Sequence, residues 1–192
     1  MPVHNIPETY LCSALDSVLG QVYPYWELCA TYDSSTQAHI GQVLKGYAER
    51  DSRIRLTFRK KNARTEALNV ALDAAKGRFV GLMDCDSRLH PLALLLPAMA
   101  ISAGNDIKLV YTDEDMIDRA DKRFNPYFKP DWNPDLLLSC NYIGHLALYE
   151  RQRLEDTGRF RSGFDGVQSY DMLLRFVEGN GLAPCDRLET SG

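Results

Sequence analysis

The sequence predicts an α/β fold, in which a doubly wound, mostly parallel sheet carries helices on both faces. Stretches with the pattern of strands alternate with stretches with the pattern of helices over the first half of the chain, and helical crossovers of this kind join parallel strands. Three of the four predicted strands lead into acidic residues, as expected where ligands gather at the carboxyl ends of parallel strands. A chain of 192 residues suits a single domain with a substantial core.

Helices are predicted where apolar residues recur three and four positions apart. Gly20 and Gly77 mark the ends of two of them, and Pro91 is suited to the first turn of another. The predicted helices cover residues 8–19, 42–50, 66–75 and 91–103.

Strands are predicted for short apolar or alternating runs between polar turns, at residues 26–31, 54–58, 78–83 and 108–111. Their carboxyl ends should meet at one edge of the sheet, where we expect the site. Further along, residues 119–141 are proline-rich and aromatic without a regular pattern, whereas residues 143–149 alternate again.

Composition and charge exclude several classes of protein. A net charge of -4 and a pI of about 5.6 give no electrostatic reason to expect a nucleic acid partner. The five cysteines are scattered and form no C-x-x-C pair, which favours free thiols in the cytoplasm. No signal peptide is expected. The longest apolar run, residues 92–101, is broken by Pro97 and is too short to span a bilayer, so any membrane association should be peripheral.

Asp84 and Asp86 close the predicted strand at residues 78–83. Side chains two positions apart on an extended chain point the same way. One carboxylate could therefore hold a divalent metal while the other takes a ribose or a water ligand. Taken alone, such a pair is more typical of a turn or a helix cap.

Several motifs, in their order and spacing, together resemble glycosyltransferase family 2, the inverting nucleotide-sugar enzymes of GT-A fold. The resemblance covers nearly the whole chain. The long run at residues 128–139 resembles a subgroup linked to cell-surface polysaccharide and rhamnan synthesis. The matching segments are residues 1–5 (MPVHN), 17–28 (SVLGQVYPYWEL), 32–36 (YDSST), 67–72 (ALNVAL), 84–86 (DCD), 111–115 (YTDED) and 128–139 (FKPDWNPDLLLS).

The resemblance implies a metal-dependent enzyme that moves a sugar from a UDP- or dTDP-sugar to a glycan or lipid-linked acceptor with inversion. It implies a GT-A domain over residues 1–192 that looks incomplete at both ends, with a nucleotide-sugar-binding half at residues 1–115 and an acceptor-side half at residues 116–192. The expected location is the cytoplasm, including the inner face of the membrane.

The resemblance also implies roles for individual residues. Asp33 would accept the imide N–H of uracil or thymine, although an Asx turn is an open alternative that is compatible with this role. Asp84 would contact the ribose, and Asp86 with Asp84 would hold the Mg²⁺ or Mn²⁺ that bridges the two phosphates. The other donor-binding positions implied by the motifs are Pro2, Val3, Asn5, Asn62, Arg64 and Asn69.

Ser169 occupies the position of the family's catalytic base. That base takes the proton of the acceptor hydroxyl as it attacks the anomeric carbon, which a neutral serine hydroxyl cannot do. Two functions therefore stay open: a transferase with a substitute base, or a catalytically inactive nucleotide-sugar-binding module or partner subunit. The candidate substitute bases are Asp171, Glu114, Asp115 and Asp165.

Three further residues have two interpretations each. Tyr127 and Trp132 could form an acceptor platform, because sugars pack their apolar faces on aromatic rings, or they could anchor an irregular loop. His145 lies in an alternating run, which favours a buried core histidine over a metal ligand.

A nucleotidyltransferase would share the parallel sheet and the acidic metal site. Such enzymes carry a glycine-rich, basic loop after the first strand. Residues 4–8 (HNIPE) contain no such loop, which argues against this class.

Overall fold

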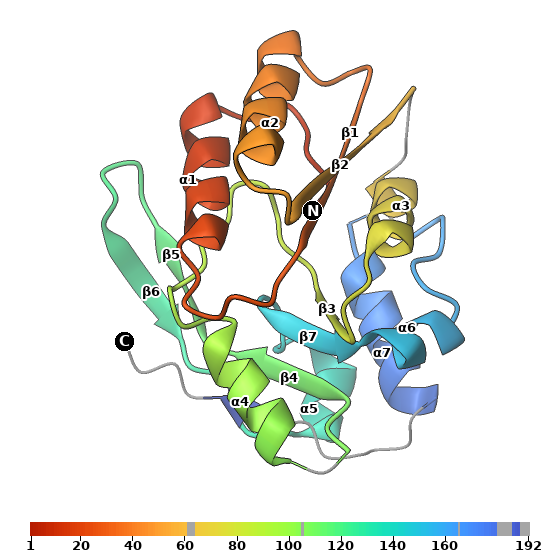
Figure 1. The fold of residues 1–192 in the computed structure, drawn as a ribbon. Helices are drawn as coiled ribbons and strands as arrows, with labels where there is room; N and C mark the ends of the chain where they lie inside the picture. Colours follow the sequence, from red (N-terminus) through yellow and green to blue (C-terminus); the bar gives the residue numbers. More distant parts are fainter. Residues whose placement is uncertain (61–63, 105, 165, 180–185, 189–192) are drawn as a thin grey trace.

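The computed structural model describes residues 1–60, 64–104, 106–164, 166–179 and 186–188 (Figure 1). Two candidates named above, Asn62 and Asp165, lie outside these residues. Helices and strands alternate along the first half of the chain, so the predicted α/β class is confirmed.

A parallel pair of strands forms the first layer. β1 (Leu28–Asp33) pairs with β2 (Ile54–Arg59) in parallel along the full length of both strands. Compared with the prediction, β1 begins and ends two residues later. The N-terminal segment lies beside β1: Val3 donates its N–H to the carbonyl of Thr31 at 2.8 Å. The segment from Pro2 to Val3 is thereby held at the carboxyl end of β1.

Helices cover both faces of this pair. Figure 1 shows α1 (Glu8–Leu19) and α2 (Ala38–Arg50) on one side and α3 (Arg64–Ala74) on the other. The buried side of α1 carries Leu11 and Leu15, four residues apart, as an amphipathic helix requires. The helices predicted at residues 8–19, 42–50 and 66–75 are therefore confirmed, although α2 and α3 begin earlier than predicted.

A mixed sheet of four strands forms the second layer. Its order is β3-β7-β4-β8, where β7 lies antiparallel to both β3 and β4, and β8 is parallel to β4. The series of parallel strands predicted from the sequence thus ends at β4. The strand β7 comes from the later run at residues 143–149 and pairs in the antiparallel sense. The strands are β3 (Phe79–Gly81), β4 (Leu109–Thr112), β7 (Ala147–Glu150) and β8 (Asp186–Leu188).

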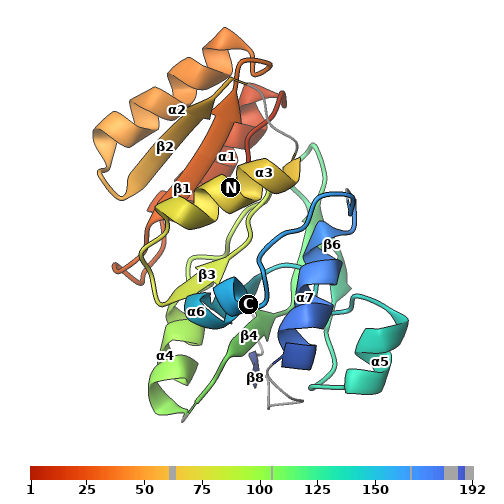
Figure 2. The same ribbon diagram turned by 90° about the vertical axis from the view of Figure 1, so that its right-hand side faces the viewer.

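Four helices surround the second sheet. In Figure 2, α6 and α7 lie on the same side of the molecule as α3. The predicted helix at residues 91–103 begins at residue 95 instead, because residues 91–94 form turns, with Ala93 N–H donating to the His90 carbonyl. These helices are α4 (Leu95–Ala103), α5 (Pro134–Ser139), α6 (Arg151–Asp156) and α7 (Gln168–Gly179).

An antiparallel hairpin projects from the second layer. It joins β5 (Glu114–Ile117) to β6 (Arg123–Tyr127), and Glu114 is paired with Tyr127 in its register. The sequence pattern did not predict it. Every residue of β6 is exposed, so the strand has no buried face, and Pro126 within the run argued against a strand.

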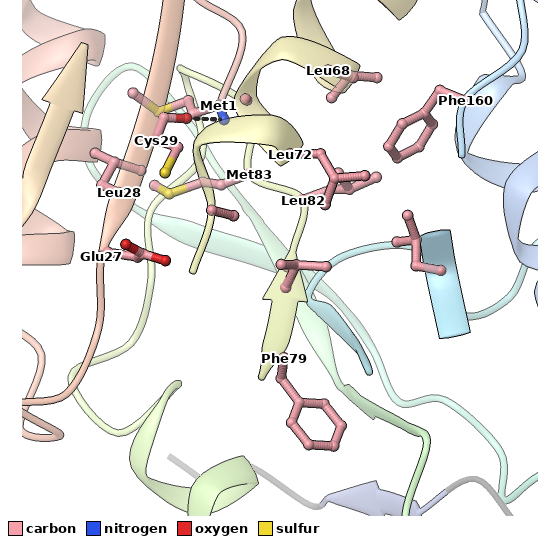
Figure 3. A pocket seen from close by; sticks show the side chains of 15 residues that line it. Met1, Glu27, Leu28, Cys29, Leu68, Leu72, Phe79, Leu82, Met83 and Phe160 are labelled. Atoms are coloured by element: carbon pink, nitrogen blue, oxygen red, sulfur yellow. Dashed lines mark hydrogen bonds between the residues drawn. The ribbon is translucent and has the colours of Figure 1, made fainter. Parts of the chain in front are cut away.

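A small cavity of about 120 Å³ lies between β1 and β3, and the two strands belong to separate hydrogen-bonded sheets. Figure 3 shows the side chains of Leu72, Met83 and Phe160 among those around it. The layers therefore meet here through apolar side chains. The core is correspondingly divided into two clusters, one around Leu15 and Leu44 and the other around Tyr111 and Leu173.

Candidate functional site

The carboxyl ends of β1 and β3 point to the same region of the molecule, as the sequence predicts. Here a pocket of about 220 Å³ opens beside the N-terminal segment, and it is called the N-terminal pocket below. It contains four of the predicted donor-binding residues, namely Pro2, Val3, Asp33 and Arg64. Its complete lining is Pro2, Val3, His4, Thr31, Tyr32, Asp33, Ser35, Arg64 and Ala67.

Asp33 shapes the loop that walls the N-terminal pocket. Its Oδ1 accepts the backbone N–H of Ser35 at 2.8 Å, which is the Asx turn considered from the sequence. Asn5 stabilises the same loop from outside the pocket lining, because its side chain donates to the carbonyl of Ser35 and accepts from the N–H of Gln37. Asp33 therefore takes part in a turn and faces the pocket as well.

Asp84 lies between the N-terminal pocket and a second opening. Nη2 of Arg64, a residue of the N-terminal pocket, is 2.6 Å from Asp84 Oδ1. On the other side, Nε2 of His145 is 3.6 Å from Asp84 Oδ2. Asp84 thus contacts one residue from the lining of each opening, Arg64 through an ion pair and His145 at a longer distance.

The second opening is a cleft of about 660 Å³ between the loop after β3 and the β5–β6 hairpin. Asp86 and His145 contribute to its lining. Four carboxylates line the cleft, so it is called the acidic cleft. These are Asp86, Asp113, Glu114 and Asp115.

Asp84 and Asp86 are oxygen donors of the kind that Mg²⁺ and Mn²⁺ prefer. Among the described residues there is no group of three or more His, Cys, Asp or Glu side chains that could hold a metal ion. Mg²⁺ in nucleotide sites is commonly held by one or two carboxylates, with phosphate and water oxygens completing its shell. The pair therefore fits a cation that arrives with a diphosphate.

Ser169 lies near the start of α7 and lines a small cavity of about 30 Å³ together with His145. Two residues later, the side chain of Asp171 is buried and forms ion pairs with Arg161 and Arg175. The hydrogen bond from Arg161 lowers the pKa of Asp171, with a further contribution from Arg175 against the opposing effect of burial. Asp171 is thus engaged in structural ion pairs.

Glu114 and Asp115, the other candidate bases among the described residues, both line the acidic cleft. Asp115 Oδ2 pairs with Nε of Arg123 across the hairpin. Glu114 Oε2 accepts the backbone N–H of His145 at 2.9 Å, and Lys129 Nζ lies 3.5 Å away. Glu114 is thereby held beside the residue that also faces Asp84.

Two functional candidates were missed or misjudged from the sequence. His145 was interpreted as a core histidine, but its side chain is 47% exposed and faces Asp84, so that interpretation is wrong. Lys129 was not singled out. Its fully buried ammonium donates to the carbonyls of Ile143 and His145, and burial lowers its pKa. The sequence feature that could have drawn attention to Lys129 is its position between Phe128 and Pro130.

The structure places the remaining candidates, Asn69, Trp132 and Tyr127, in different surroundings. The side-chain amide of Asn69 exchanges hydrogen bonds with the backbone of Phe160, so the structure does not bring it to either opening. Trp132 packs against the second core cluster, as the anchor interpretation requires. Tyr127, in contrast, is 42% exposed and lines the acidic cleft.

No helix in the described part of the chain combines the length and the apolar character needed to cross a bilayer. The cysteines at positions 12, 29, 85 and 140 are free thiols.

Solved structures with this fold include nucleotide-sugar complexes. The structure of residues 1–349 of TarS from S. aureus in complex with UDP-GlcNAc matches with a TM-score of 0.78 at 18% identity, covering 100% of this chain and 55% of that one. The mannosyltransferase PcManGT from Pyrobaculum calidifontis, in complex with GDP-Man and Mn²⁺, matches with a TM-score of 0.68 at 18% identity, covering 98% of this chain and 53% of that one. At this identity the likeness establishes the fold.

Sequence comparison establishes the family. The O-antigen biosynthesis protein RfbC of Myxococcus xanthus is 42% identical over 178 residues, which are 92% of this chain but only 14% of that protein. Residues 1–158 match the family described as glycosyl transferase family 2. Since this match covers most of the chain, the protein belongs to glycosyltransferase family 2.

Proposed function

We propose that this chain transfers a sugar from a UDP- or dTDP-sugar to a glycan or lipid-linked acceptor, with inversion and with the help of Mg²⁺ or Mn²⁺. The observation that carries the proposal is the position of Asp84 between a pocket lined by Asp33 and Arg64 and a larger acidic cleft. A two-substrate enzyme needs two adjoining sites of this kind. Family membership and the UDP-GlcNAc complex of a protein with the same fold also support it.

The donor occupies the N-terminal pocket in this proposal. Asp33 accepts the imide N–H of the base, and Pro2 and Val3 line the pocket that receives it. Asp84 contacts the ribose, and Asp86 with Asp84 holds the metal ion. The ion, when bound, would neutralise charge on the leaving diphosphate. Arg64 pairs with Asp84 through one N–H group, and its remaining N–H groups can donate to the diphosphate at this point.

Glu114 is the acceptor base in this proposal. It removes the proton from the acceptor hydroxyl, whose oxygen forms a bond to the anomeric carbon while the bond from that carbon to the diphosphate breaks. Glu114 and Asp115 both line the cleft, but Asp115 is paired with Arg123 at 2.5 Å. The ammonium of Lys129, in contrast, lies 3.5 Å from Glu114. Asp171 is buried against two arginines. Residues 1–115 would supply the donor half of the site together with Glu114, and residues 116–192 would supply the rest of the acceptor half.

The second candidate function is a nucleotide-sugar-binding module or partner subunit without catalysis. Ser169 favours it, because this hydroxyl lines the cavity next to His145 at the position of the family's base. Such a module would bind nucleotide but turn over none.

The deciding experiment measures binding and turnover in the same preparations. Calorimetry with UDP or dTDP and Mn²⁺ reports the donor site, and release of the matching nucleoside diphosphate, UDP or dTDP, from a panel of UDP- and dTDP-sugars reports transfer to an acceptor or to water. We expect Glu114→Gln to bind UDP normally and to lower turnover by about a hundredfold or more. Asp115→Asn is the matched control and should retain turnover.

The outcomes separate the two functions. Metal-dependent UDP binding without any turnover by the wild-type chain, together with turnover gained in Ser169→Asp, would establish the binding module. Binding of neither UDP nor dTDP would exclude both.

We also propose a cytoplasmic location, including the inner face of the membrane. The free cysteines support it, since thiols persist in a reducing compartment.

A further inference from the structure

Tyr127 and Glu114 are directly opposite each other in the antiparallel β5–β6 hairpin. Side chains of directly opposed residues lie on the same face of an antiparallel pair, and both of these line the acidic cleft. Burial raises the pKa of Tyr127 most, and Cys140 and the neighbouring Glu114 carboxylate raise it further. An aromatic ring therefore lies beside the proposed base, on a strand that makes no contribution to either core cluster.

We propose that Tyr127 is the stacking platform for the terminal sugar of the acceptor, and that this sugar is electrically neutral. The inference rests on the proposed function and names the acceptor chemistry of the same site. A pyranose has an apolar face that packs on an aromatic ring. A sugar stacked on Tyr127 presents its hydroxyl groups toward Glu114, its cross-strand partner. The aromatic residue thus orients the acceptor for proton removal.

The charges of the acidic cleft select against an anionic acceptor. Four carboxylates line it, whereas the guanidinium groups in the lining are those of Arg88 and Arg123. Each of these already pairs with a carboxylate, Arg88 with Asp121 and Arg123 with Asp115. Among the described residues that line the cleft, every arginine is paired with a carboxylate. A uronate or phosphate group would therefore meet like charges, and like-charge juxtaposition is costly. A bound nucleoside diphosphate adds further negative charge.

The test compares two glycosides that differ only at C6. Methyl β-glucoside is neutral, and methyl β-glucuronide carries a carboxylate on the same ring. Their dissociation constants are measured by ligand-detected NMR on the full chain, both with and without saturating UDP and Mn²⁺. We expect the glucoside to bind at least about tenfold more tightly than the glucuronide, because of charge repulsion.

Two variants identify the platform. Tyr127→Ala should weaken glucoside binding about fivefold, through loss of the stacked ring. Phe128→Ala is the matched control, since Phe128 is the next residue, is 70% exposed and is absent from the cleft lining. It should change binding less than about twofold. Calorimetric UDP binding should be the same in both variants and the wild type.

Equal or tighter binding of the glucuronide, or an unchanged affinity in Tyr127→Ala, would overturn the inference whether or not UDP binds. Loss of UDP binding with retained, Tyr127-dependent glucoside binding would instead remove the proposed donor function and leave the sugar platform standing.

Discussion

The guanidinium group of Arg64 lies 2.6 Å from the carboxylate of Asp84, and this ion pair joins the start of α3 to the loop after β3. Arg64 also lines the N-terminal pocket. The pair therefore lies at the boundary between the pocket and the acidic cleft, and the remaining N–H groups of Arg64 are available as donors where the proposed diphosphate would lie.

Arg64→Ala should weaken UDP binding about tenfold, because a charge-assisted hydrogen bond contributes about 1.5–3 kcal/mol. Thermal stability should change little, since the Arg64 side chain is 47% exposed. Lys45→Ala, which removes an equal charge from the exposed face of α2, is the control. Calorimetry at two salt concentrations provides the measurement, and equal losses in both variants would contradict a local role for Arg64.

Asp86→Asn should remove the effect of Mn²⁺ on UDP binding. The proposed cation is held by two carboxylates, and an amide oxygen carries no charge to retain it. We expect UDP affinity of the variant to be the same with Mn²⁺ and with EDTA, whereas the wild type should bind more tightly with Mn²⁺. Asp156→Asn, an exposed change in α6, should behave as the wild type. Metal-dependent binding retained in Asp86→Asn would contradict the assignment.

Gly144→Ala should reduce turnover more than stability. Gly144 has φ +50°, and a Cβ there would lie 2.9 Å from Oε1 of Glu114, which would have to move. Gly163→Ala is a matched control, because Gly163 has φ +87° and no atom of the described residues lies within 4 Å of its Cβ position. Both variants should lose about 1 kcal/mol of unfolding free energy from backbone strain. Only Gly144→Ala should also lower kcat, and equal kcat values would argue against Glu114 as the base.

Asp171→Asn should destabilise the chain by about 2 kcal/mol near neutral pH, because it leaves Arg161 and Arg175 without their carboxylate. The folded-state pKa of Asp171 is lowered by these arginines, Arg161 first. Its stabilising contribution is therefore complete above the unfolded pKa of about 4 and is lost as the pH falls through the lower folded value.

Denaturant unfolding at several pH values tests this. The difference between wild type and Asp171→Asn should shrink in acid, whereas Asp73→Asn, which breaks an exposed pair with Arg159, should cost less than about 1 kcal/mol throughout. A difference between wild type and Asp171→Asn that does not depend on pH would contradict the ion-pair explanation.

Local sequence patterns predicted the elements whose side chains have a buried and an exposed face. The helix α1 follows from Leu11 and Leu15, and β1 and β2 follow from short apolar runs between polar turns. The hairpin β5–β6 was not predicted, because β6 is exposed at every position and contains Pro126, which argues against a strand. The antiparallel direction of β7 in the sheet depends on its pairing with β3 and β4, which are distant in the chain.

The same distinction applies to the site. Asp33, Asp84 and Asp86 were predicted because each follows a strand in a recognisable motif. The contact between His145 and Asp84 joins residues that are far apart in sequence, and no local pattern encodes it. The alternation around His145 instead suggested a buried side chain. The role of Lys129 likewise depends on the carbonyls of Ile143 and His145, which only the folded chain brings to it.

The shared position of Asp84 has a thermodynamic consequence. A ligand that draws this carboxylate toward the N-terminal pocket alters its interaction with His145, and hence the residue that Glu114 holds at the acidic cleft. The affinities of the ligands that bind at the two openings are then linked by one coupling free energy, and this coupling must be reciprocal. Nucleotide bound on one side would change sugar affinity on the other by the same factor that sugar changes nucleotide affinity.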